Sequence, residues 1–307
     1  MNESRIQECV LGIDAGGTRI RARLADAATG AVLAEGAGGP GNALSVPAAA
    51  LVENLARALG GAVPPGRAGA VVSVVAGFAG GGPGGGVANA RAGLLEALGG
   101  AGVPGGVRVE VLGDADIAFA AGPGVPEDGL VLIAGTGATA ARVAGRRVVR
   151  AVDGDGWLLG DGGSGFWLGR EALRAVLRAL DGRGPRTALT GPVGEVCGGL
   201  SKEAVVGYGF GGHPVRLAAL SPLVVDVARG GDEVARTLLD RAADELAATV
   251  RALEPRPGEP LVVTGGLTGP DGPLLARLAD RVGAWGLTPA AVRDGVGGAV
   301  ALARLLA

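Results

Sequence analysis

A carboxylate followed closely by a glycine turn is the first feature of the chain that suggests chemistry. The segment VLGIDAGGTRIRARLAD, residues 10–26, places Asp14 at the end of an apolar run, just before Gly16, Gly17 and Thr18. Glycines in a tight turn expose consecutive backbone N–H groups, which bind phosphate oxygens. Asp14 would repel the phosphate unless a cation lay between them, so we interpret it as a ligand of Mg²⁺, directly or through water. The alternative is an ordinary Gly-Gly hairpin in which Asp14 accepts turn amides.

Two further glycine-rich turns follow apolar segments later in the chain. Gly135, Thr136 and Gly137 come after LVLIA, and could bind the same phosphate chain from a second lobe. Gly265 and Gly266 come after LVV, where bare backbone would let a purine and a ribose approach closely. Taken alone, each turn is equally typical of a simple hairpin or a strand-to-helix loop. The chain has no GxxxxGK[ST] P-loop, and its first glycine pair leads into a strand, unlike a Rossmann fingerprint.

Two acidic positions could interact with a hydroxyl group of a substrate: Asp114, for which Asp116 is the alternative, and Asp161. Asp114, in VLGDADIAFA, ends an apolar segment before a predicted helix, where a carboxylate can act as general base in phosphoryl transfer to an alcohol. The alternative is a helix N-cap. Asp116 is the other possible base, but two residues into the helix we expect it to point elsewhere. Asp161, in DGDGWLLGDGGSGFW, could accept hydrogen bonds from sugar hydroxyls, or be an exposed acid in a loop that enters a helix.

Composition excludes several other classes of protein. The 307 residues are 48% apolar and carry a net charge of −2, with no basic patch of the kind that binds nucleic acid. Cys9 and Cys197 are the only cysteines and lie in no CxxC pair, so we expect neither a disulfide nor a zinc site. His213 is the only histidine, without a nucleophile elbow or second ligand, and is interpreted as structural. The N-terminus lacks a signal pattern and no apolar run is long enough to span a membrane, which predicts a cytoplasmic protein with no membrane partner.

The apolar pattern predicts an α/β protein built from two similar lobes with a cleft between them. Period-two alternation over residues 10–35 predicts antiparallel strands, and helix and strand patterns then alternate. Residues 130–145 repeat the opening arrangement of strand, glycine turn and strand, which suggests the second lobe. The expected elements are helices at 49–59, 90–100, 163–180, 231–253, 273–282 and 295–307, strands at 68–80, 107–113 and 259–264, and surface connections at 81–89 and 180–194.

Eight segments occur in an order that is more specific than any one of them: GIDAGGTRIRARLAD, GGPGN, VAGFAG, LGDADIAFAAG, LIAGTGATAARV, GDGGSGFWLGREAL, LVVTGGL and GVGGAVALARLL. The chain resembles the BadF/BadG/BcrA/BcrD ATPase family, and within it N-acetylglucosamine kinases, over nearly its whole length. The resemblance implies the actin-like, ribonuclease H-like ATPase fold. Residues 1–115 would form the N-terminal lobe and residues 116–291 the C-terminal lobe, with a closing helix at about 292–307 that packs back on the first.

The same resemblance implies a reaction and a role for each candidate residue. ATP and Mg²⁺ would be the cofactors, and the 6-hydroxyl of N-acetylglucosamine or a related hexosamine would be phosphorylated. Asp14 would hold Mg²⁺, Asp114 would be the catalytic base, and the sugar would be bound by Asn42, Asp114, Thr136 and Asp161. The nucleotide and its phosphates would be bound by Gly16, Gly17, Thr18, Gly135, Thr136, Gly137, Gly265 and Gly266.

Two other functions compete with this interpretation. One is a BadF-type ATPase that activates a radical dehydratase or reductase through an iron–sulfur cluster held by two cysteines per subunit at a dimer interface. Cys9, before the first strand, and Cys197, expected in a late loop, are poorly placed for that cluster. The other is a non-catalytic sugar sensor, which the retention of Asp114 beside both phosphate hairpins argues against. The kinase interpretation requires a small-molecule sugar and leaves room for a homodimer.

Overall fold

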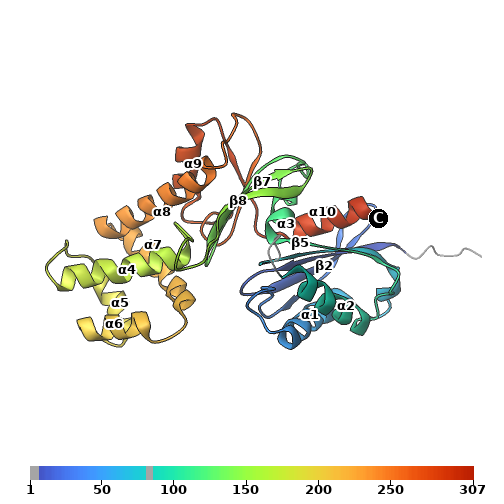
Figure 1. Ribbon diagram of the computed structural model, residues 1–307, viewed down its shortest axis with the longest axis horizontal. Helices are drawn as coiled ribbons and strands as arrows, with labels where there is room; N and C mark the ends of the chain where they lie inside the picture. Colours follow the sequence, from blue (N-terminus) through green and yellow to red (C-terminus); the bar gives the residue numbers. More distant parts are fainter. Residues whose placement is uncertain (1–6, 81–85) are drawn as a thin grey trace, which may run out of the picture. The chain divides into compact units, whose positions relative to one another are not determined.

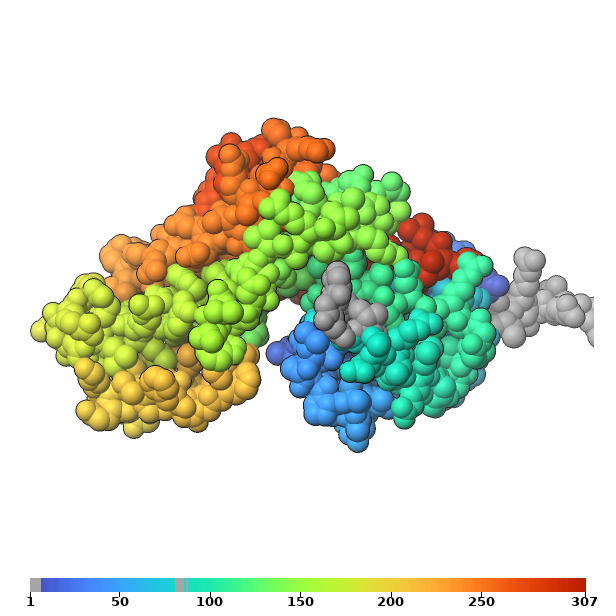
Figure 2. All heavy atoms as spheres, viewed as in Figure 1, coloured from blue at the N-terminus to red at the C-terminus, as the bar shows by residue number. Residues whose placement is uncertain are grey.

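The chain folds into two compact units, which are described here one at a time. The computed structural model describes residues 7–80 and 86–307. Unit 1 comprises Met1–Asp128, Val143–Val148 and Asp294–Ala307, and unit 2 comprises Gly129–Arg142 and Val149–Arg293. Each unit contains one five-stranded sheet with helices packed on it (Figure 1). Figure 2 shows all heavy atoms in the same view, coloured by position in the chain.

The sheet of unit 1 brings the ends of three parallel strands to one edge. Its strand order is β3-β2-β1-β4-β5, with β1 antiparallel to β2 and parallel to β4, and β4 parallel to β5. Side chains at the carboxyl ends of parallel strands share an edge of the sheet, which is where open α/β sheets bind ligands. The strands are β1 (Cys9–Ala15), β2 (Ile20–Asp26), β3 (Val32–Gly38), β4 (Val71–Phe78) and β5 (Arg108–Gly113).

Strand β1 is buried on both faces, which explains its unbroken apolar sequence. Leu11 and Ile13 pack into the core formed with α1 and α2, whereas Val10 packs with α3 and α10 on the opposite face. Successive side chains of a strand point to opposite faces, so Asp14 belongs to the face of Val10 and α10. The helices of unit 1 are α1 (Ala48–Ala62), α2 (Val87–Gly100), α3 (Asp114–Ala120) and α10 (Val296–Leu306), with a short 3₁₀ turn η1 (Ala68–Ala70) before β4.

Unit 2 repeats the strand order of unit 1. Its sheet runs β10-β9-β6-β7-β8, with β6 parallel to β9 and β9 parallel to β10, so that β6, β7 and β8 correspond in order to β1, β2 and β3. The two-lobed α/β fold expected from the repeated pattern is thereby confirmed. The strands are β6 (Gly129–Ala134), β7 (Ala138–Ala144), β8 (Arg147–Asp153), β9 (Leu261–Thr264) and β10 (Pro289–Ala291).

The helices of unit 2 surround a core in which α4 and α8 are the longest elements. Buried residues of both helices pack with β6 and β9 in one apolar cluster. Among the described residues, no helix is both long and apolar enough to cross a membrane. The helices are α4 (Gly165–Leu180), α5 (Thr190–Cys197), α6 (Lys202–Phe210), α7 (Ser221–Arg229), α8 (Glu233–Arg251) and α9 (Leu275–Gly283), with a 3₁₀ turn η2 (Pro214–Leu220).

Two expectations about connections need correction. The tract 180–194 is not all connection, because α5 begins at Thr190. In the tract 81–89, residues 81–85 lie outside the described part of the chain, and α2 already begins at Val87. Unit 1 extends to Asp128 and includes α3, which packs against α10.

Candidate functional site

In unit 1, the turn between β1 and β2 leaves backbone amides open. The strand register closes with Ala15 opposite Ile20, and the N–H of Gly16 donates to the carbonyl of Arg19 at 3.0 Å. The N–H groups of Gly17 and Thr18, both exposed residues, donate to no residue of the described chain. A Cβ on Gly17 would meet no atom within 4 Å, so nothing inside the protein requires glycine there. The turn can therefore bind an anion through two free amides, and the bare backbone gives that anion room.

Asp14 is buried, with one carboxylate oxygen anchored and the other free. Its Oδ2 accepts the N–H of Gly295, the N-cap residue of α10, at 3.0 Å, and the side chain of Arg21 lies 3.9 Å from the same oxygen. Arg21 also lies 3.4 Å from the carboxylate of Asp294. Burial raises the pKa of Asp14, as does the charge of Asp294, while the Gly295 hydrogen bond and Arg21 lower it. Oδ1 has no hydrogen-bond partner in the described part of the chain, so it is available to a cation.

Asp114 lies at the same edge of the sheet as Asp14. Strand β4 separates them, with Asp14 opposite Gly77 and Gly77 opposite Leu112, and Asp114 directly follows β5. Burial raises the pKa of Asp114 to about 7, and the negative charges of Asp14 and Asp116 add to the effect. A carboxyl group with a pKa near neutrality is suited to general-base catalysis, because it is ionised at pH 7 to a useful extent yet basic enough to take a proton.

Asp116, not Asp114, closes the start of α3. The N-cap residue is Gly113, so Asp114 is the first helical residue and the N-cap alternative for it is wrong. Asp116 accepts the N–H of Gly113 at 3.0 Å on Oδ2 and the N–H of Val148 at 2.7 Å on Oδ1. It is 8% exposed; burial raises its pKa, and both hydrogen bonds lower it. Asp116 is thus fully engaged with backbone amides of its own unit.

The side-chain carbonyl oxygen of Asn42 is occupied by hydrogen bonds within its own turn. Oδ1 accepts the N–H groups of Leu44 at 2.9 Å and Ser45 at 3.0 Å, which holds the chain before α1. The residue is half-buried, and its side-chain N–H₂ donates to no described residue. Asn42 can therefore offer a ligand hydrogen-bond donors, rather than an acceptor.

In unit 2, Gly135, Thr136 and Gly137 form the turn between β6 and β7 at the start of α4. The carbonyl of Gly137 accepts the N–H of Gly135 at 2.9 Å. The carbonyl of Gly135 accepts the N–H of Gly165 at 2.8 Å, and the carbonyl of Thr136 accepts the N–H of Phe166 at 3.1 Å. The N–H groups of Thr136 and Gly137 donate to nothing within the described residues. As in the first turn, carbonyl groups accept hydrogen bonds from within the protein, and two backbone N–H groups are left to bind an anion.

Asp161 lies directly beside this second turn. Its Oδ1 accepts the N–H of Ala138, the first residue of β7, at 3.0 Å. A Cβ added to Gly137 would lie 2.6 Å from the same oxygen, so a side chain at position 137 would displace the carboxylate of Asp161. Burial raises the pKa of Asp161, the Ala138 hydrogen bond lowers it, and the charges of Asp153 and Asp155 raise it further.

Asp153, which sequence reasoning did not single out, holds the loop that carries Asp161. Its Oδ1 accepts the N–H groups of Asp161 at 2.6 Å and Gly154 at 2.7 Å, and its Oδ2 accepts that of Gly162 at 2.9 Å. Both aspartates adopt left-handed backbone conformations, with φ of +62° at Asp153 and +58° at Asp161. Three amides on one carboxylate fix a backbone that would otherwise be strained. The signal available in the sequence was an aspartate at the end of a strand before a glycine-rich loop.

The third glycine turn adjoins the second through Ala134. Gly265 has a φ of +99°, and a Cβ on it would lie 2.2 Å from the carbonyl oxygen of Ala134, so glycine is required there for reasons internal to the fold. Gly266 is free of such contacts. The carbonyl of Ala134, the last residue of β6, also accepts the N–H of Leu267 at 3.0 Å. Gly265 is therefore explained by packing, and only Gly266 is left bare without a structural need.

The remaining candidates have structural roles. His213 caps η2 through Nδ1, which accepts the N–H of Val215 at 3.4 Å. Cys9 is fully buried and is the first residue of β1, not a residue before the strand as the sequence predicted. Cys197 is the last residue of α5, so its expected place in a loop was wrong. Burial raises the pKa of both thiols. Within residues 7–80 and 86–307, no three acidic, histidine or cysteine side chains are grouped so as to hold a metal ion by themselves.

The arrangement of two repeated sheets, each with an open glycine turn after its first strand, agrees with a family assignment across the chain. The model of the BadF/BadG/BcrA/BcrD ATPase family matches residues 11–303. The chain belongs to this family. A solved structure, titled a putative N-acetylglucosamine kinase from Chromobacterium violaceum, is 28% identical, with a TM-score of 0.76 over 96% of this chain and 98% of that one.

Other similarities within and beyond the family are partial or concern the fold alone. The N-acetyl-D-glucosamine kinase of Dictyostelium discoideum is 28% identical over 169 residues, which are 52% of this chain and 53% of that protein. The N-acetylmuramic acid/N-acetylglucosamine kinase of Clostridium acetobutylicum is 29% identical over 48% of each chain. The match thus spans about half the length of these curated relatives. A ROK family glucokinase from Streptomyces griseus, solved with glucose and AMPPNP, shares the fold at 20% identity, with a TM-score of 0.60 over 97% of this chain and 99% of that one.

Proposed function

We propose that this BadF-family protein is an ATP-dependent kinase that phosphorylates the 6-hydroxyl of N-acetylglucosamine or a related hexosamine. The observation that carries the proposal is Asp114, a carboxyl group with a pKa of about 7 at the carboxyl edge of β1, β4 and β5, on the same edge as Asp14. The N-acetylglucosamine kinases among its relatives support the class of acceptor.

In the proposed reaction Asp114 takes the proton of the sugar hydroxyl. The hydroxyl oxygen forms a bond to the γ-phosphorus while the bond from that phosphorus to the leaving ADP oxygen breaks. The basicity of Asp114 comes from burial beside Asp14, because an ionised carboxylate is poorly solvated there and gains from accepting a proton. Asp116 is proposed to keep a structural role, since both of its oxygens are committed to backbone amides.

Backbone N–H groups in each unit would bind the phosphates. In unit 1 the donors would be Gly17 and Thr18, with Gly16 shaping the turn, and in unit 2 they would be Thr136 and Gly137, with Gly135 shaping the turn. Free amides and bare glycines suit an anion with several oxygens, because such donors need no desolvated side chain and lie close to the ligand. We assign Gly265 and Gly266 to the nucleotide's adenosine part, with the bare Gly266 as the position of closest approach.

Magnesium fits the residues around Asp14. Mg²⁺ is usually bound by one or two carboxylates together with substrate phosphates and water, so a single buried aspartate with a free oxygen is a sufficient protein contribution. Asp14 meets that description, since Oδ2 is anchored on Gly295 and Oδ1 is free of described partners. The ion would neutralise charge on the phosphates.

The sugar would be bound by groups of complementary character in the two units. Asn42 would donate from its side-chain N–H₂, because its carbonyl oxygen is occupied. Asp161 would accept from sugar hydroxyls through Oδ2, because its Oδ1 is engaged with Ala138. Thr136 adds a hydroxyl at the second turn. These assignments, a cytoplasmic location and the homodimer remain predictions.

The activator function is disfavoured by the cysteines. Cys9 is fully buried in β1, where its Sγ lies 3.3 Å from the carbonyl of Gln7, and a thiol without access cannot hold an exposed cluster. Burial also disfavours the thiolate that a cluster would need. No specific observation favours the sensor function.

A coupled assay of ADP release tests the proposal. The panel is N-acetylglucosamine, glucosamine, N-acetylmuramic acid, glucose and buffer alone, each with Mg²⁺ and ATP. We expect ADP release that depends on a hexosamine and exceeds the buffer rate by orders of magnitude. Equal ADP release with and without every sugar would favour an ATPase over a kinase, and no release at all would favour the sensor.

A further inference from the structure

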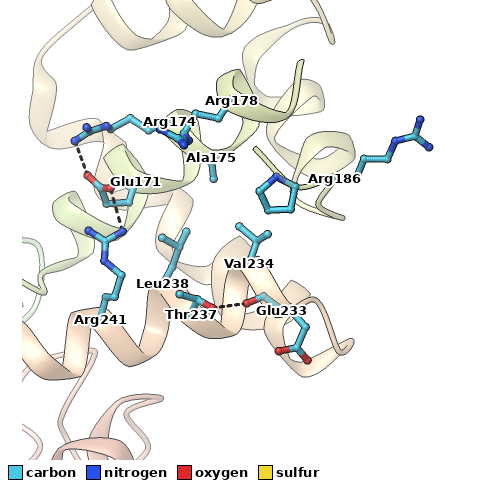
Figure 3. Close-up of a pocket in the computed structure, with 11 residues that line it drawn as sticks. Glu171, Arg174, Ala175, Arg178, Arg186, Glu233, Val234, Thr237, Leu238 and Arg241 are labelled. Carbon is cyan, nitrogen blue, oxygen red and sulfur yellow. Dashed lines mark hydrogen bonds and ion pairs between the residues drawn. The ribbon is translucent and has the colours of Figure 1, made fainter. Parts of the chain in front are cut away.

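Unit 2 contains a cavity with the character of an anion-binding site. It has a volume of about 560 Å³ and lies between α4, the first half of α8 and the segment at Pro185 (Figure 3). None of its lining residues belongs to the glycine turns or to the loop of Asp153 and Asp161. A volume of this size suits a small organic molecule.

The lining is positive in a chain that is negative overall. Four arginines and two glutamates line the cavity, a net charge of +2, whereas the whole chain carries −2. Glu171 is 7% exposed and its charge is already balanced inside the protein. Arg174 lies 3.0 Å from one of its oxygens and Arg241 lies 3.7 Å from the other. Glu233, the other acidic residue of the lining, is paired with Arg236 at 2.8 Å.

Glu171 also orients the arginines. In Figure 3 it lies between Arg174 of α4 and Arg241 of α8, joined to each by an ion pair. Arg241 stacks over the ring of Trp167 at 5.2 Å, which restrains it further. A guanidinium group has five N–H donors, so one ion pair leaves others for a ligand. Restrained arginines lose less freedom on binding than free ones, which favours affinity.

A third guanidinium group, that of Arg178, also comes from α4. Arg178 lies one turn after Arg174 on α4, and the one described hydrogen bond of its side chain, at 3.2 Å, goes to the carbonyl of Arg183. Arg186, by contrast, extends away from these three in the close-up, so we assign it no part in the site. Ala175, Val234 and Leu238 form an apolar wall of the cavity, beside the polar side chains of Glu233 and Thr237.

We infer that this cavity binds a small organic phosphate monoester. Guanidinium groups match phosphate oxygens in geometry, and a phosphate monoester carries close to two negative charges at neutral pH, opposite in sign to the net charge of the lining. Arg174, Arg178 and Arg241 bind the phosphate, and the apolar wall covers the organic group. The inference does not depend on the kinase function, since no residue is shared with the proposed reaction.

Calorimetric titration of the full chain with phenyl phosphate tests the inference. Phenyl phosphate has an apolar body and is not a sugar, and saturating ADP is included to occupy any nucleotide site. We expect saturable binding, at least about tenfold weaker with inorganic phosphate, because hydrophobic contact is lost. Arg178→Gln and Arg174→Gln should each weaken binding at least about tenfold, the usual effect of losing a charge-assisted hydrogen bond. Arg229→Gln, at an exposed arginine of α7 outside the cavity, is the matched control and should bind as wild type.

Three results would overturn the inference. One is the absence of saturable binding by phenyl phosphate up to about 10 mM, where affinity is too weak to be specific. Another is unchanged binding in both cavity variants, which would place the ligand elsewhere. The last is equal affinity for inorganic phosphate and phenyl phosphate, which would show that the apolar wall contributes nothing and that the ligand is free phosphate.

Discussion

Burial and the negative charge of Asp14 together raise the pKa of Asp114 to about 7, although β4 lies between the strand of Asp14 and the strand that Asp114 follows. Burial of Asp114 is the larger cause. The pair resembles other sites in which neighbouring carboxylates are driven to different pKa values, so that one remains a base near neutral pH. Under the proposed function, Asp14 raises the pKa of the base in the cation-free enzyme and, when the nucleotide is present, binds the cation, whose positive charge then offsets this effect.

Activity should therefore rise with pH around neutrality. Asp114 must be ionised to take a proton, so kcat/KM should fall about tenfold per pH unit below a midpoint near 7. Asp14→Asn should shift this midpoint to lower pH in the residual activity, because a negative neighbour is removed. Binding of ATP measured at each pH separates titration of the nucleotide from that of the enzyme. A profile flat down to pH 5 would contradict the assignment of Asp114 as the titrating base.

Asp114→Asn should stabilise the protein at alkaline pH. The folded-state pKa lies above that of the unfolded chain, so the native state binds more protons between about pH 4 and 7 and the carboxylate costs stability as pH rises through that window. Asn carries no charge, and the gain in unfolding free energy should be on the order of 1–4 kcal/mol at pH 8 and smaller at pH 5. Urea unfolding at both pH values measures it, with Asp226→Asn on the surface of α7 as control. A loss of stability at pH 8 would show that burying the ionised carboxylate of Asp114 does not destabilise the folded protein.

Asp153→Asn should impair the sugar site and leave the nucleotide site intact. Asn keeps an oxygen for one side of the carboxylate but turns an N–H₂ group toward an amide, so at least one of the hydrogen bonds to Gly154, Asp161 and Gly162 is lost. We expect KM for the sugar to rise about tenfold or more, with little change in KM for ATP. Asp155→Asn, in the same loop but without a hydrogen bond to a described amide, is the matched control. Equal KM values for both variants would remove the positioning role of Asp153.

The sequence revealed strands and glycine turns but not the contacts that complete the site. The β1–β2 hairpin was predictable because its alternation is strictly local, and the repeat of that pattern predicted the second sheet. Strand β8 was missed because it is half-exposed and its apolar residues do not alternate. Helices α5 and α6 were missed because glycine interrupts both and their apolar faces are weak.

The unforeseen site residues act across long separations in the chain. Asp294 and Gly295 reach Asp14 and Arg21 only because α10 returns to the first sheet. Val148 reaches Asp116 through the tip of the β7–β8 hairpin. No local pattern of residues can specify such partners, because the spacing between them is set by tertiary packing rather than by helix or strand period.

Asp116→Asn should reduce stability more than catalysis. One of its oxygens becomes an N–H₂ group facing the N–H of Gly113 or Val148, and an unsatisfied buried donor costs about 1–3 kcal/mol. Thermal unfolding should show the loss, while kcat of the folded fraction, measured at low temperature, should stay within a few-fold of wild type. An inactive but fully stable variant would make Asp116 the better candidate for the base.

The central claim, that Asp114 takes the hydroxyl proton, is tested most directly by kcat of Asp114→Asn at saturating ATP and hexosamine. The account predicts a fall of roughly 10²–10⁴-fold, the usual effect of removing a general base, in a protein that is folded and binds ATP as wild type does. Sugar affinity should fall only modestly, because Asn still hydrogen-bonds the hydroxyl. A kcat within a few-fold of wild type would contradict the claim and reduce Asp114 to a structural residue at the start of α3.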